Sequence, residues 1–227
     1  MDHGNLVDFL FGNKKTLGTK EKRINDLTIR GSLFSLIGLL IIMENISILT
    51  SFLIFNQSYG ILGIENIVMY YPFKTIFMII GLIITFFGFS FYDKAVKESS
   101  AKLGLFHKSS FYLILGIIFF LIFLNAIASV LNSFEYFLNN PGYQPYISNS
   151  QTLYMAIFYL ITILFILIAN IALTFNLFKL SKTTKTAIFG VISPLFLIPF
   201  LNIAAALILL VSSFTISIRS EEGIYNN

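Results

Sequence analysis

Five polar residues lie inside long apolar stretches of the sequence, where side chains able to carry charge or bind ligands are rare. They are Glu44, Asn45, Asn125, Asn170 and Asn202. Counted at 1.5 Å of rise per residue from the end of its stretch that is flanked by basic residues, Glu44 lies about 20 Å deep. The asparagines of the other stretches lie about 15 to 24 Å deep by the same count. Four stretches therefore contribute to one predicted polar layer.

The state of Glu44 decides what this polar layer could do. A carboxylate at the centre of a bilayer costs roughly 2.5 kcal/mol or more, and it marks a candidate functional site. If Glu44 is charged, the layer is a proton or cation site in which the asparagine amides complete the coordination. If burial keeps Glu44 protonated, the same residues are hydrogen-bonded contacts that hold helices together. Both interpretations stay open.

The titratable residues outside this layer do not form a catalytic set. The two histidines, His3 and His107, lie outside the apolar stretches, which excludes a haem held by two facing intramembrane histidines of this chain. Asp93 follows Tyr92 as in intramembrane aspartyl proteases, but no second aspartate lies at membrane depth to share its proton. Cysteine and the glycine-rich phosphate-binding motifs are absent. We therefore predict no enzyme, no cofactor and no metal site.

The elements that must position the polar layer are membrane-spanning helices. Of the 227 residues, 56% are hydrophobic and 11% are charged, whereas roughly a quarter are charged in soluble domains. Five apolar stretches, at 31–55, 73–92, 109–131, 153–180 and 188–218, each reach the roughly 20 residues that a spanning helix needs. The alternation typical of a membrane β-barrel is absent. The sequence predicts an all-α, polytopic transmembrane bundle of five spans over 31–218, between tails at 1–30 and 219–227.

Basic residues predict how the bundle is oriented. Of the 15 lysines and arginines, six lie in 1–30, four in 93–108 and three in 179–185, all on one side of the predicted bundle. The other two are Lys74 and Arg219. Because basic loops face the cytoplasm, we predict a cytoplasmic N-terminus and an external C-terminus in a multi-pass protein of the cell membrane. A candidate N-glycosylation site at Asn56 falls in a predicted outer loop.

Two prolines interrupt the fifth stretch shortly before Asn202. Pro194 and Pro199 each remove a backbone donor and favour a kink. At 31 residues the stretch is long enough for one tilted and kinked span. A broken helix, which in transporters exposes backbone groups to a substrate, is the other interpretation.

Small residues recur at helical spacing in the first two stretches. Gly31, Ser35 and Gly38 share one helical face, and Gly81, Thr85 and Gly88 do the same in the second stretch. Such faces let helices approach closely. We predict that they pack within the bundle.

Three short segments of the sequence have a recognisable pattern. The segment TIRGSLFS at 28–35 leads into the first stretch, and FKLS at 178–181 precedes the proline-containing PFLN at 199–202. These segments resemble an archaeal family of multi-span membrane proteins that is catalogued as domain-of-unknown-function family 973. The resemblance implies an archaeal cell membrane protein, and it transfers no site residues.

The absence of a catalytic set, the short loops and the few ionisable groups at depth favour a non-catalytic membrane protein. We expect an accessory or scaffold subunit that packs in the lipid bilayer against other membrane proteins or copies of itself, with no nucleic-acid partner. The alternative is a small-solute or ion transporter or channel built around Glu44 and the asparagine layer. A third interpretation, a subunit that lends residues to a shared cofactor site, requires a partner chain.

Overall fold

The computed structural model describes residues 10–11, 18–45, 61–99, 108–140, 149–198 and 201–225. Four long helices come first: α2 (Thr19–Asn45), α4 (Ile61–Glu98), α5 (Ser109–Asn139) and α6 (Asn149–Thr184). They are followed by the short helix α7 (Ala187–Ile192), the 3₁₀ helix η1 (Ser193–Leu197) and the long helix α8 (Leu201–Tyr225). The described residues form helices and no strands, which confirms the predicted all-α class.

Five of these helices, α2, α4, α5, α6 and α8, are long and apolar enough to cross a membrane. Helices α4, α5 and α6 contain the second, third and fourth apolar stretches and extend beyond them. Helix α2 begins at Thr19, inside the predicted tail, and covers the first stretch as far as Asn45, while residues 46–55 lie outside the described residues. Helix α8 covers the fifth stretch only from Leu201. Helices are favoured in lipid because they satisfy their backbone hydrogen bonds within one segment. The chain is therefore a multi-pass membrane protein.

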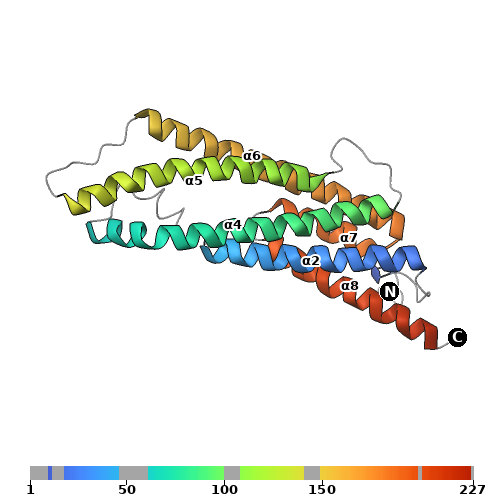
Figure 1. The fold of residues 1–227 in the computed structure, drawn as a ribbon. Helices are drawn as coiled ribbons and strands as arrows, with labels where there is room; N and C mark the ends of the chain where they lie inside the picture. Colours follow the sequence, from blue (N-terminus) through green and yellow to red (C-terminus); the bar gives the residue numbers. More distant parts are fainter. Residues whose placement is uncertain are drawn as a thin grey trace.

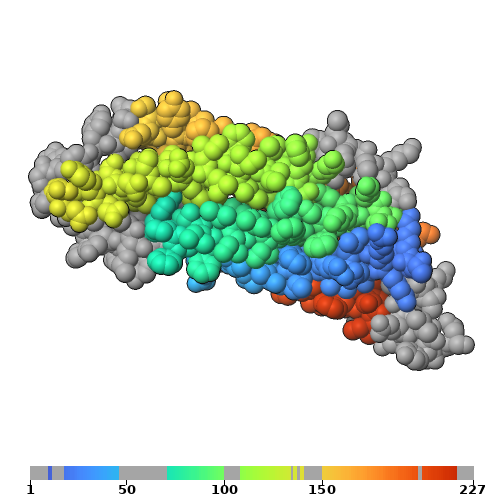
Figure 2. Space-filling model, in the orientation of Figure 1, coloured from blue at the N-terminus to red at the C-terminus, as the bar shows by residue number. Residues whose placement is uncertain are grey.

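The long helices lie side by side in an elongated bundle (Figure 1). Helix α2 packs against α4 on one side and α8 on the other, while α5 packs against α6 and α4. Figure 2 shows α5, α4 and α2 in sequence across one face, with α8 emerging beside the start of α2. Helices α2 and α5 run in one direction along the bundle, and α4, α6 and α8 run in the other.

Small residues bring α2 and α4 into backbone contact. A methyl group added at Gly38 would lie 2.6 Å from the backbone oxygen of Gly81, and one at Gly88 would lie 2.6 Å from the backbone nitrogen of Ser35. Only glycine fits at such an approach, because backbone atoms cannot move aside as a flexible side chain can. The predicted small-residue faces therefore pack against each other inside the bundle, and that prediction is confirmed.

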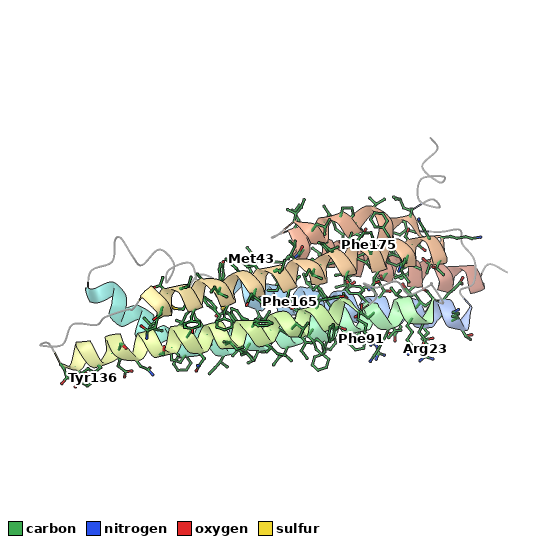
Figure 3. The ribbon with its side chains drawn as sticks, turned by 90° about the horizontal axis from the view of Figure 1, so that it is seen from above. Arg23, Met43, Phe91, Tyr136, Phe165 and Phe175 are labelled. Atoms are coloured by element: carbon green, nitrogen blue, oxygen red, sulfur yellow. The ribbon has the colours of Figure 1, made fainter. Side chains whose placement is uncertain are left out.

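Aromatic rings fill the contact between α5 and α6. Phe119 stacks on Phe165 with centroids 5.4 Å apart and planes 5° apart. Phe123, which is almost fully buried, lies 5.4 Å from the ring of Tyr159. Figure 3 shows Phe165 between the two helices, whereas Phe175, further along α6, is exposed. Offset and tilted rings of this kind contribute roughly 0.5–1.5 kcal/mol per pair beyond their burial.

The fifth apolar stretch is divided into two arms that fold back on each other. The first arm, α7 with η1, enters the bundle from the end where α6 finishes, and α8 returns toward that end (Figure 1). The Thr174 hydroxyl on α6 donates to the backbone oxygen of Ser193 at 3.0 Å, which places the first arm against α6. The Asn25 amide on α2 donates to the backbone oxygen of Ser213 at 3.0 Å, which places α8 against α2. We call α7, η1 and α8 together the re-entrant hairpin.

The hairpin changes the expected path of the chain. The first arm of eleven residues, six α-helical and five 3₁₀, is about 19 Å long, too short for the roughly 30 Å hydrocarbon core. Pro194 lies in the first turn of η1, and Ile198 is extended, so the chain turns back. The end of α8 consequently lies with the start of α2 (Figure 1), whereas opposite ends were expected. Arg219, near the end of α8, therefore belongs to the side of the bundle that the basic residues predict to be cytoplasmic. Which side faces the cytoplasm stays a prediction.

Candidate functional site

Glu44 lies on the outer face of α2. Leu33, Ile37, Leu40 and Glu44 follow one another at spacings of three and four residues, and all four are exposed. Residues at these spacings share one helical face, so Glu44 continues the apolar stripe that faces away from the bundle. Asn45, the next residue, is buried and donates to the backbone oxygen of Ile41 at 2.7 Å. Its amide thus bonds to its own helix.

Asn125 continues an outward stripe in the same way on α5. Ile118, Ile122, Asn125 and Ser129 are all exposed and recur at helical spacing. The Ser129 hydroxyl donates to the backbone oxygen of Ala126 at 2.8 Å. Asn125 therefore lies on a surface that is apolar toward the middle of α5 and polar toward its end.

Asn170 and Asn202 are associated with the re-entrant hairpin. Asn170 is half-buried and precedes Thr174, which contacts the first arm, by one turn on the same face of α6. Asn202 is half-buried in the first turn of α8. With its amide nitrogen turned toward the first arm, Nδ2 lies 2.8 Å from the backbone oxygen of Phe196, 3.1 Å from that of Ile198 and 3.2 Å from that of Leu195.

The structure does not gather the five polar residues into one layer. Because Asn25 and Ser213 are paired on antiparallel helices, Asn202 lies near the level of residue 36 of α2, and Glu44 is about 12 Å further along. Asn125 is on α5, which packs against α4 and α6. Among the described residues, no hydrogen bond joins any two of these five. Pro194 lies in η1, whereas Pro199 and Asn56 fall outside the described residues.

Asp93 makes the densest set of polar contacts found in the described part of the chain. Its carboxylate accepts from the backbone nitrogens of Ser109 and Ser110, at 3.1 and 2.9 Å, and from their hydroxyls, at 2.7 and 2.6 Å. The Asn176 amide on α6 donates a fifth bond at 2.9 Å. A carboxylate at a helix start satisfies free backbone donors and complements the helix dipole. Asp93 on α4 thus caps α5 and ties both helices to α6.

The sequence contained a signal for this cap that our interpretation missed. Ser109 and Ser110 open the third apolar stretch, where serine is typical of a helix start, and Asp93 follows the second stretch on the same predicted side. Taken with Tyr92 alone, Asp93 resembles only half of a protease pair. The cap instead gives its carboxylate a role in joining helices.

A line of buried polar residues follows the inner face of α2. Asn25, Thr28, Ser32 and Ser35 are all buried and recur at helical spacing. The Ser32 hydroxyl is 2.8 Å from the hydroxyl of Tyr92 on α4, which is fully buried. The Tyr92 ring in turn meets the ring of Phe196 on η1, with centroids 6.4 Å apart. These residues join α2, α4 and the hairpin near the end where α2 begins.

The chemistry available in the described residues is hydrogen bonding by amides, hydroxyls and backbone oxygens. No cluster of three or more histidine, cysteine, aspartate or glutamate side chains occurs in the ranges that the structure describes. What stands out is the placement of polar groups: Asp93 and Asn25 face inward, Glu44 and Asn125 face outward, and Asn202 faces three backbone oxygens.

Comparison with known proteins found no match to a family model, a curated protein or a solved structure. The resemblance carried by residues 28–35, 178–181 and 199–202 therefore stays a prediction. The function must be argued from the arrangement of this chain's own residues.

Proposed function

We propose that this chain is a non-catalytic subunit of a membrane assembly, which packs against other membrane-spanning helices or against copies of itself. The observation that carries the proposal is the outward direction of Glu44. This side chain extends the exposed stripe of Leu33, Ile37 and Leu40 on α2, at a depth of about 20 Å from residue 31.

A carboxyl group at this depth is costly when it faces lipid. Transfer to the hydrocarbon costs a few kcal/mol even by the scale that gives the lowest values. The cost falls when a neighbouring helix supplies a hydrogen-bond donor or an opposite charge. A partner helix on this stripe would satisfy Glu44 and cover the adjacent apolar side chains.

Asn125 supports the same proposal from a second face. Its amide lies on the exposed stripe of α5 that includes Ile118 and Ile122. Amides that face out of one bundle can bond across to a neighbouring helix, and such bonds contribute about 0.6 kcal/mol on average. Two outward polar groups on different helices thus favour contacts on more than one face.

The absence of cysteine from the sequence allows a sharp test. A single cysteine introduced by Leu40→Cys, one turn from Glu44 on the same stripe, carries a cross-linker in native membranes. The matched control is Leu160→Cys, which is exposed on α6 without a polar neighbour of this kind. We expect a discrete protein adduct from Leu40→Cys, lost in combination with Glu44→Leu, and none from Leu160→Cys. Adducts with lipid alone at both positions would contradict the proposal.

A second function, passage of a small solute or ion, is favoured by the re-entrant hairpin. Irregular backbone at membrane depth occurs where it is buried in protein or lines a watery cavity, and broken helices bind substrates in transporters. Because Glu44 faces outward, such a route would pass Asn202 instead. Ion flux into vesicles containing the protein tests this: we expect Glu44→Gln to leave flux unchanged and Asn202→Leu to reduce it. No flux above that of empty vesicles would exclude this function.

A further inference from the structure

The end of α6 carries positive charge without a neighbouring negative one in the sequence. Lys179, Lys182 and Lys185 follow one another at intervals of three residues, and no aspartate or glutamate occurs between Glu135 and Glu221. We propose that these lysines and the exposed phenylalanines just before them form a binding site for an anionic phospholipid. The lysines hold its phosphate, and its acyl chains lie along the aromatic rings. The proposal does not depend on the assembly function.

The first argument is that the three lysines are not neutralised by the described part of the chain. At the same end of the bundle, Arg23 pairs with Glu98 at 3.0 Å and Arg30 pairs with Asp26 at 3.1 Å. Both pairs belong to α2 and α4. None of the described carboxylates lies within ion-pair distance of the three lysines of α6 and its following turn. Their ammonium groups are therefore available to an anionic ligand.

The second argument is the position of the lysines at the edge of the membrane. Lys179 is the first charged residue of α6, so it marks the point where this helix leaves the hydrocarbon. Phe175 and Phe178 are 53% and 40% exposed, and they share one helical face with Lys182, which is also exposed. Lysines at such an edge extend their ammonium groups to the level of the headgroups. One face of α6 thus offers a surface for acyl chains followed by positive charge for a phosphate.

The third argument is the backbone of Lys185. Its φ of 55° lies in the left-handed region, and the Thr186 nitrogen donates to the Ser181 oxygen at 3.2 Å, which is a common ending of an α-helix. Glycine is usual at this position because a side chain is disfavoured there. Strained positions of this kind cluster at functional sites. A ligand for the ammonium group accounts for a lysine where glycine would be more stable.

Helix α7 fixes the turn that carries these lysines. A methyl group added at Gly190 would lie 3.3 Å from Cβ of Ser181 and 3.5 Å from Cδ1 of Phe178, so α7 packs directly against the last turn of α6. A site on a fixed turn loses less conformational freedom on binding than one on a loose segment. The lysines are therefore preorganised.

Charge determines which phospholipid fits. A lysine ammonium binds phosphate as a point charge, and clusters of basic residues beside a membrane-spanning helix attract anionic headgroups. Phosphatidylcholine also contains a phosphate, but its own quaternary ammonium group opposes the lysines. Phosphatidylglycerol has no such group and keeps a net negative charge. We therefore expect the site to prefer phosphatidylglycerol to phosphatidylcholine.

The absence of tryptophan from the sequence allows a direct test. Phe178→Trp places one fluorophore beside the lysines, and the full chain is reconstituted in phosphatidylcholine vesicles. A set fraction of the lipid is replaced by brominated phosphatidylglycerol or, as the reference, by brominated phosphatidylcholine, whose bromines quench the fluorophore on contact. We expect phosphatidylglycerol to occupy the site about fivefold more strongly. High salt should reduce this preference because it screens charges.

A matched pair of double variants shows whether the preference belongs to this site. In the Phe178→Trp background, Lys182→Gln with Lys185→Gln should abolish it. Lys94→Gln with Lys97→Gln removes the same charge from α4 at the same end of the bundle, where Lys94 lies 5.4 Å from the ring of Phe91, and should leave the preference unchanged. Equal quenching by the two lipids before any lysine is replaced, or an equal loss in both double variants, would overturn the proposal.

A single variant separates lipid binding from a structural role of Lys185. Lys185→Gly should raise the thermal unfolding midpoint in lipid-free detergent by about 2 °C or more, because glycine adopts the left-handed conformation without strain. The same substitution should weaken the preference for phosphatidylglycerol in the fluorescence measurement. A lower midpoint together with an unchanged preference would show that Lys185 serves the turn and not a lipid.

Discussion

The amide of Asn25 on α2 donates to the backbone oxygen of Ser213 on α8 at 3.0 Å, across 188 positions of the sequence. Asn25 is six residues from the start of its helix, and Ser213 is twelve from the start of α8. This pairing sets the level at which the second hairpin arm packs. It also means that α8 lies beside α2 and runs antiparallel to it.

We predict that Asn25→Ala loosens the attachment of α8. The variant loses one buried hydrogen bond, which contributes about 0.5–1.5 kcal/mol to stability. Thermal unfolding in detergent should show a lower midpoint, while Asn125→Ala, on an exposed face, should shift it little. An equal loss in both variants would mean that the pairing does not stabilise the fold.

Gly88→Ala should be strongly destabilising. Its added methyl group would lie 2.6 Å from the Ser35 backbone nitrogen, so α2 and α4 would have to separate, at a cost of about 1–3 kcal/mol. The matched control is Gly18→Ala, since a methyl group at Gly18 meets nothing within 4 Å. Chemical unfolding of both variants checks this. A Gly88 variant as stable as the control would show that the two backbones are not in contact.

Loss of the Asp93 cap should weaken the junction of α4, α5 and α6. Asp93→Ala removes five hydrogen bonds from one carboxylate. We expect a loss of roughly 1–3 kcal/mol, within the range for caps and charged acceptors. Proteolysis between α4 and α5 should also accelerate. Asp26→Ala serves as the control because the ion pair of Asp26 with Arg30 is exposed. Similar proteolysis rates in the two variants would contradict the prediction.

The path of the chain predicts which cysteines label from the same side of the membrane. Lys20→Cys near the start of α2 and Ile218→Cys near the end of α8 should react alike with a membrane-impermeant maleimide. With a cytoplasmic N-terminus, neither reacts in intact cells, whereas Asn140→Cys, just beyond the far end of α5, does. Labelling of only one member of the first pair would show that α8 crosses the membrane.

The sequence predicts where the helices lie in the chain better than it predicts which face of each helix is buried. Long apolar stretches mark each helix, and the spacing of Gly31, Ser35 and Gly38 identifies a contact because only small residues allow it. Helices that are apolar all round, however, do not indicate which side is buried. A count of residues along each stretch therefore places Glu44 and Asn202 at a similar depth. In the structure, Glu44 faces outward from α2, whereas Asn202 faces backbone oxygens of η1.

The hairpin could not be predicted for a different reason. Pro194 fits both a kinked span and a helix break, because proline removes a backbone donor in either case. What decides between them is long-range: the bonds of Thr174 to Ser193 and of Asn25 to Ser213. Contacts between residues far apart in the chain leave no local pattern in the sequence.

The turn between η1 and α8 also has a consequence for biosynthesis. Helices α2, α4, α5 and α6 run alternately in opposite directions before α7 begins, and α8 ends on the side where α2 began (Figure 1). If the N-terminus is cytoplasmic, as predicted, the acidic pair Glu221 and Glu222 does not have to cross the hydrocarbon during insertion.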